Sequence, residues 1–70
     1  MKITYDKEAD ALYIKFRDGE FAKNKKIDDF TVIDFDEKGN ILGIELLDAS
    51  QRIPAESLTE VNVKNILATI

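Results

Sequence analysis

Apolar and polar residues alternate along most of the first two thirds of the chain, which predicts β-strands. The expected strands are residues 2–5, 11–17, 30–36 and 41–47. The loop between the last two contains glycine and has the length of a hairpin connection. The pattern therefore predicts an antiparallel β-meander of about four strands.

The segment from Glu20 to Asp29 has little periodicity and carries three lysines. It fits either a loop or an additional strand over residues 21–27. Lysine on an outer strand discourages the pairing of one sheet with another, so the composition suits a sheet edge. We favour the edge strand.

The C-terminal segment has helical spacing. It follows Pro54, a residue that is common at the first position of a helix. Its apolar residues fit the i, i+3, i+4, i+7 template of an amphipathic helix: Leu58, Val61, Val63, Ile66, Leu67 and Ile70. The expected fold is α+β, with a helix over residues 55–70 packed on one face of the sheet.

The two central strands carry apolar residues at adjacent positions, Val32 beside Ile33 and Leu46 beside Leu47. A sheet covered on one side only would alternate strictly, so we expect a cover on each face. The helix supplies one cover, and a second copy of the chain would supply the other. The length of 70 residues favours the same homodimer, because so small a domain has a marginal core on its own.

Composition narrows the classes of function. Ten Lys and Arg against fourteen Asp and Glu give a net charge of −4, which argues against nucleic acid or an anionic membrane as the main partner. Cysteine and histidine are absent, so disulfides, thiolate chemistry and imidazole sites are excluded. With neither a signal-peptide pattern nor a membrane-spanning apolar run, we expect one cytoplasmic domain over residues 1–70.

Residues 34–45 resemble a calcium-binding loop in the spacing of their acidic residues and glycine. However, Lys38 occupies a ligand position and the flanking segments are strand-like, so a β-hairpin with a charged turn is the better interpretation. The acidic residues near the first expected turn more commonly bond backbone N–H groups than metal. A metal or small-ligand site would need both acidic turns at the same end of the sheet, and would use Asp6, Glu8, Asp10, Asp34 and Asp36.

The sequence shows no combination of a nucleophile, a general base and a group that orients the base. Ser50 and Ser57 have no histidine to activate them. We therefore expect a protein that is not an enzyme, with no catalytic residue, cofactor site or metal site.

Two stretches resemble a family of small prokaryotic proteins, the domain of unknown function 2283 family. The first is Tyr5-Asp6 followed by residues 9–14, and the second is residues 34–50, with its Asp-Phe-Asp, Gly-Asn and Gly-Ile-Glu-Leu-Leu-Asp-Ala-Ser motifs. The family has no assigned activity, so the resemblance implies no catalytic residue. It implies structural roles: hairpin shaping by Asp34, Asp36 and Gly39, close approach at Gly43, and capping by Asp48 with Ser50.

The leading hypothesis is a non-enzymatic domain that self-associates and binds another protein. An alternative, suggested by the resemblance because members of such families often lie beside toxin-like genes, is an antitoxin-like partner of a small basic toxin. The second alternative is the metal or small-ligand site in the acidic turns.

Overall fold

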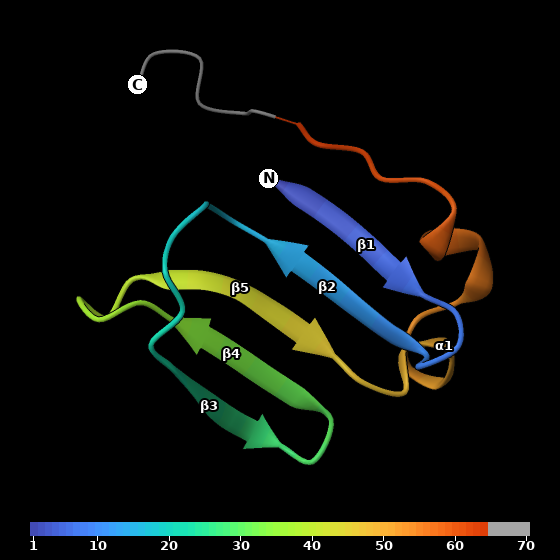
Figure 1. The fold of residues 1–70 in the computed structure, drawn as a ribbon. Helices are drawn as coiled ribbons and strands as arrows, with labels where there is room; N and C mark the ends of the chain where they lie inside the picture. Colours follow the sequence, from blue (N-terminus) through green and yellow to red (C-terminus); the bar gives the residue numbers. More distant parts are fainter. Residues whose placement is uncertain (65–70) are drawn as a thin grey trace.

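The computed structural model describes residues 1–64, which form one antiparallel sheet with two short helical turns after it (Figure 1). The sheet has five strands, one more than the four expected. They are β1 (Lys2–Asp6), β2 (Ala11–Lys15), β3 (Lys23–Asp28), β4 (Thr31–Phe35) and β5 (Ile41–Leu46). The helix α1 (Ala49–Arg52) and the 3-10 turn η1 (Ala55–Leu58) follow.

The strand order is β1-β2-β5-β4-β3, so the sheet is not the simple meander that the sequence predicted. Strands β3, β4 and β5 do follow one another as a meander, but β5 then pairs with β2. This order puts the apolar β5 at the centre and leaves the polar β1 and β3 at the two edges. Residues 23–28 are thus an edge strand, which confirms the interpretation of the lysine-rich segment.

The connection between β2 and β3 crosses the sheet to reach the far edge (Figure 1). The N–H of Phe16 donates to the carbonyl of Leu42 (2.8 Å), and the N–H of Ala22 donates to that of Phe35 (2.9 Å). Gly19 lies so close to Leu42 that a Cβ there would be 2.6 Å from Leu42 Cδ2. The crossing segment therefore covers Leu42, which is 5% exposed.

The strand register separates the two faces of the sheet, because successive side chains point to opposite sides. In register, Ile14 lies opposite Ile3 and Ile44, and Ile44 lies opposite Ile33. We call this side the apolar face: Ile3, Tyr5, Leu12, Ile14, Ile33, Ile44 and Leu46, with Thr31 and Lys25 at its β3–β4 side. The other side, the polar face, carries Lys2, Thr4, Asp6, Tyr13, Lys15, Lys26, Val32, Asp34 and Glu45.

The expectation of apolar residues on both faces is confirmed for β4, where Val32 pairs with Glu45 on the polar face and Ile33 with Ile44 on the apolar face. It is wrong for the pair Leu46 and Leu47. Leu47 lies beyond the end of β5, where its N–H donates to the carbonyl of Phe30 (2.8 Å). Two adjacent residues point to opposite faces of a sheet only where both belong to a strand, and Leu47 does not.

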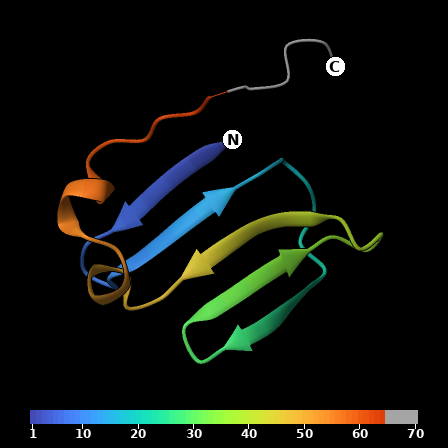
Figure 2. The same cartoon turned by 180° about the vertical axis from the view of Figure 1, so that it is seen from behind.

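The expected helix over residues 55–70 is wrong for the described part of that range. Only Ala55–Leu58 is helical, as a single 3-10 turn, and residues 59–64 are not. Val61 and Val63 are 56% and 83% exposed, and β-branched residues such as these have low helix propensity. Seen from both sides, residues 59–64 run beyond the β1 edge and across neither face (Figures 1 and 2). Residues 65–70, with the rest of the expected helix, lie outside the described residues.

Gly43 should be intolerant of a side chain. A Cβ at this position would lie 2.6 Å from Tyr13 Cζ and 2.7 Å from the carbonyl oxygen of Ile14, which belongs to the neighbouring strand. We expect Gly43→Ala to lower the free energy of unfolding by about 1–3 kcal/mol, measured by urea denaturation. Adding Tyr13→Phe should recover only part of the loss, because the backbone contact stays. An unchanged urea midpoint in Gly43→Ala would contradict the close approach.

Candidate interaction surface

The acidic residues of the β1–β2 turn are engaged in holding the turn itself. Asp6 Oδ1 accepts hydrogen bonds from the backbone N–H groups of Glu8 (3.0 Å) and Ala9 (3.2 Å). This is an Asx-type turn, in which the carboxylate takes the place of a backbone acceptor. The turn interpretation of the sequence is confirmed here.

Asp10 ties this turn to the first turn of α1. Its carboxylate accepts hydrogen bonds from the Tyr5 hydroxyl (2.7 Å), the Ser50 hydroxyl (2.7 Å) and the Ser50 N–H (2.9 Å). Its carbonyl accepts one from the N–H of Ala49 (2.9 Å). Donation by the Ser50 hydroxyl, and then by the Tyr5 hydroxyl, lowers the pKa of the Asp10 carboxyl, because these bonds favour its ionised form.

The expected cap from Asp48 is therefore wrong. Asp48 makes no side-chain capping bond and instead has left-handed backbone, with φ of 53°. Asp10, also left-handed with φ of 51°, supplies the acceptors from a distant turn. Ser50 takes part as expected, but as a donor to Asp10. The sequence held no local signal of this contact, because the two residues are 40 positions apart.

Asp36 organises the β4–β5 turn in the same manner. Its Oδ1 accepts from the N–H groups of Lys38 and Asn40 (both 2.9 Å), and its Oδ2 accepts from Asn40 Nδ2 (2.9 Å). Bonds from the Asn40 side chain and backbone lower the pKa of the Asp36 carboxyl. Gly39 has the positive φ (84°) that the turn requires. The hairpin interpretation of residues 34–45 is confirmed, with strands on both sides.

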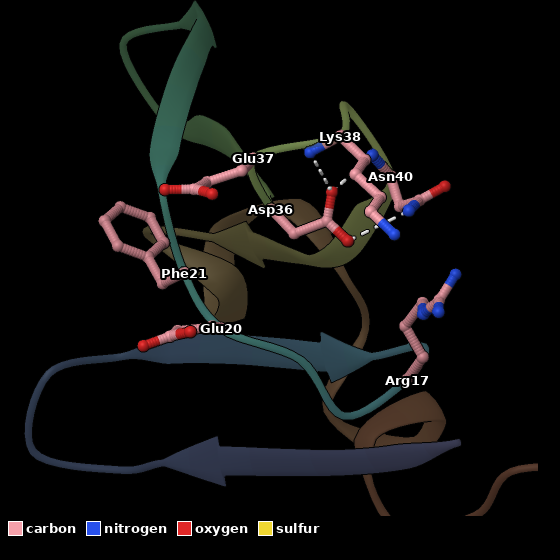
Figure 3. Close-up of a pocket in the computed structure, with 7 residues that line it drawn as sticks. All are labelled: Arg17, Glu20, Phe21, Asp36, Glu37, Lys38 and Asn40. Atoms are coloured by element: carbon pink, nitrogen blue, oxygen red, sulfur yellow. Dashed lines mark hydrogen bonds between the residues drawn. The ribbon is translucent and has the colours of Figure 1, made fainter.

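A shallow pocket of about 370 Å³ lies beside this turn, between the crossing segment and the hairpin (Figure 3). Its lining mixes both signs of charge, and the side chains do not converge. In Figure 3, Glu20 and Phe21 point away from Arg17, and the Asp36 carboxylate is occupied by its own turn. The pocket therefore presents no arrangement that selects a ligand.

The two acidic turns lie at opposite ends of the sheet. The β1–β2 turn is beside α1, at the end where Leu12 pairs with Leu46, whereas the β4–β5 turn is at the end where Phe35 pairs with Ile41 (Figure 1). A shared metal or ligand site needs them together, so this hypothesis lacks its required geometry. Residues 1–64 contain no group of three or more acidic side chains placed to hold a metal ion.

Tyr13 and Asp34 meet on the polar face, across Gly43. The Tyr13 hydroxyl donates to Asp34 Oδ2 (3.3 Å), and the ring fills the space that a side chain at Gly43 would occupy. Desolvation, and then the charge of Asp34, raise the pKa of the Tyr13 hydroxyl. The phenol therefore stays protonated at neutral pH, which suits packing rather than nucleophilic chemistry. Asp34 thus bonds Tyr13 instead of shaping the hairpin turn as expected.

The described part of the chain covers the apolar face incompletely. Its central residues Ile14, Ile33, Ile44 and Leu46 are half-buried, and Ile3 and Tyr5 at its β1 side are 36% and 38% exposed. Among residues 1–64, the buried apolar side chains are Leu12, Leu42 and Ala49. Register places Ile33, Ile44 and Leu46 together.

The Asp10 contacts should make stability depend on pH. A lowered pKa in the folded state means that the ionised carboxylate stabilises the fold above the ordinary carboxyl pKa, and that this contribution is lost as pH falls through the lowered value. We expect Asp10→Asn to unfold at a lower temperature than the parent at neutral pH, and the difference to shrink in acid. Thermal melts across pH measure it.

Asp29→Asn is the matched control for that experiment, because the only ion pair of Asp29 within residues 1–64 is exposed and long, at 3.9 Å to Lys26. It should leave the melting temperature nearly unchanged. A difference between Asp10→Asn and the parent that is the same at every pH would contradict the role given to the carboxylate.

Comparison with known proteins identifies a family and a relative of this chain, but no activity. The model of a family described as "Protein of unknown function (DUF2283)" matches residues 2–50, the whole sheet and the start of α1. Uncharacterized protein MJ0789 of Methanocaldococcus jannaschii is 48% identical over 54 residues, which are 73% of this chain and 43% of that protein. The chain thus spans less than half the length of this relative. No solved structure matches. No helix in residues 1–64 is long and apolar enough to cross a membrane. The chain belongs to the DUF2283 family.

Proposed function

We propose that this chain is a non-enzymatic interaction domain that self-associates by covering its apolar face with that of a second copy. The observation that carries the proposal is the row of half-buried isoleucines at the centre of that face, Ile14, Ile33 and Ile44. A sheet with one apolar face needs a second layer against it, and large exposed apolar patches mark interaction sites.

The dimensions of the chain support a second layer of this kind. The folded chain measures 34 × 33 × 18 Å, a broad slab that consists mainly of one sheet. Stacked sheets pack about 10 Å apart, and a stable interface buries about 800 Å² from each partner. The sheet face is smaller than these extents, because residues 59–64 run beyond the β1 edge (Figure 1), so the apolar face would have to supply most of its area to such an interface.

The placement of charge favours a second copy. Most charged side chains of the strands lie on the polar face, including Lys15, Asp34 and Glu45. Two acidic molecules can therefore pack their apolar faces together without burying these charges, and Lys25, opposite Ile33, lies on the exposed edge strand β3. The excess of negative charge lies mainly in the turns and connections, where water screens it.

The antitoxin alternative has less support. Competition with nucleic acid for a basic toxin would call for a concentrated acidic surface. The polar face instead mixes lysines such as Lys2, Lys15 and Lys26 with its carboxylates. We therefore put forward self-association, with binding of a further protein as the role of the assembled form.

Adjacent residues of β4 provide a matched test of this interface. Ile33 and Val32 are both half-buried but point to opposite faces. We expect Ile33→Glu to reduce the number of copies in the particle, because it would bury a charge between the two faces. Val32→Glu should leave that number unchanged. Sedimentation at tens of micromolar concentration measures both.

A second readout separates assembly from folding. If the fold depends on self-association, the melting temperature of the parent protein rises with protein concentration, whereas that of a monomer does not. A parent chain that sediments as a monomer, or an equal loss of assembly in both variants, would refute the proposal. Copurification at native expression level then identifies any further protein in the assembled form.

A further inference from the structure

The two edge strands of the sheet differ in what they offer to another strand. β1 and β3 lie at the outer edges, and every residue of both is exposed (Figure 1). Residues 59–64 run beyond the β1 edge (Figures 1 and 2) but form no strand, and among the described residues β1 pairs with β2 alone. An outer strand presents backbone N–H and C=O groups that can pair with another chain, and lysine is a common protection against such pairing. β3 has three lysines within six residues, whereas β1 has one within five.

We propose that β1 pairs antiparallel with β1 of a second copy, in the register centred on Thr4. In that register Lys2 lies opposite Asp6 of the second copy, Ile3 opposite Tyr5, and Thr4 opposite Thr4. Both outer pairs occur twice because of the two-fold symmetry. The five-residue segment Lys-Ile-Thr-Tyr-Asp is therefore complementary to itself when reversed.

Each of these cross-strand pairs is of a favourable type. Opposite charges, an aromatic residue beside a β-branched one, and two threonines all stabilise antiparallel strands when they face each other. This register also leaves no residue of β1 without a partner position. A shift by one residue would bring the apolar face of one copy beside the polar face of the other.

Lys2 and Asp6 can both take part in the ion pair between the two copies, as their surroundings within one copy show. Within its own sheet Lys2 lies opposite Lys15, a like charge that is already paired with Asp18 at 2.5 Å. Asp6 uses only Oδ1 for the turn, and no described residue donates to its Oδ2. A carboxylate from the second copy would thus relieve the repulsion that Lys2 meets from Lys15.

β3 does not offer the same pairing. Reversed on itself, its central registers bring Lys25 opposite Lys25, Lys25 opposite Lys26, or Lys26 opposite Lys26, and like charges directly opposite destabilise a strand pair. Only one of the two edges is therefore suited to self-pairing.

This inference rests on the self-association proposed above and adds a second contact to it, on a different surface. Antiparallel pairing about a two-fold axis keeps both apolar faces on the same side, so the joined sheet presents one continuous apolar face. The two contacts are tested by different residues, Ile33 for the face and Lys2 for the edge. Failure of one therefore does not imply failure of the other.

Hydrogen exchange tests the edge with an internal control, because β1 and β3 are both exposed edge strands of one molecule. We expect amide exchange in residues 2–6 to slow by about tenfold or more as protein concentration rises, while residues 23–28 stay unchanged. Equal exchange in both strands at every concentration would overturn the proposal. Slow exchange in β1 that does not depend on concentration would also overturn it, because a segment of the same chain would then occupy the edge.

Charge reversal provides the matched variant. Lys2→Glu would place carboxylates opposite each other at both ends of the strand pair, and we expect the dissociation constant of the edge contact to rise by about tenfold or more. Within the monomer the same change puts a carboxylate opposite Lys15, so the melting temperature at low concentration should not fall. Exchange protection of residues 2–6 should be lost.

The control is Lys26→Glu, an equal change of charge on the polar side of the other edge strand, where the ion pair to Asp29 is exposed and 3.9 Å long. It should leave assembly and the exchange of β1 unchanged. Equal effects of the two reversals would show that net charge, rather than the β1 contact, governs assembly, and would refute the proposal.

Discussion

The insertion of β5 between β2 and β4 is the constraint on which the other features of the sheet depend. It gives β5 two partners, so Ile44 meets both Ile14 and Ile33 and the apolar face becomes continuous. It brings Gly43 between Tyr13 and Asp34, which leaves room for the tyrosine ring. It also forces the chain after β2 to cross the sheet, and that crossing segment covers Leu42. The polar strands are left at the two edges.

Much of the local structure could be predicted from the sequence, because alternation and turn chemistry are local signals. Four of the five strands fall within or beside segments marked by alternation, and β3 was inferred from its lysine content instead. The Asp6 and Asp36 turns follow from the tendency of aspartate to accept hydrogen bonds from nearby N–H groups. Strand order was not predictable in this way. Nothing near residues 41–46 specifies β2 as a partner, and the Asp10–Ser50 contact joins residues 40 apart.

The expected C-terminal helix and the choice of residues on the apolar face also depended on signals that the local sequence gives only weakly. Helical spacing at Leu58 and Val61 was a weak signal, because β-branched residues in the same segment oppose a helix and few neighbours are placed to stabilise one. Similarly, Val32 and Ile33 look alike in sequence, and only the register decides which of them joins the apolar face. Chain length and apolar content led to the expectation of a second layer. The residues that form the apolar face became identifiable only with the strand pairing.

The long-range contact of Asp10 has a consequence for the order in which the chain can fold. Strands β3, β4 and β5 are neighbours in sequence and can pair as soon as they are made, since short loops close at little entropic cost. The β1–β2 hairpin is local as well, but it joins the rest only through β5 and through Ser50. The contacts that join this hairpin to the rest of the sheet therefore need β5 and residue 50 to be present. Because these contacts link distant parts of the chain, we expect them, rather than the local hairpins, to limit the folding rate.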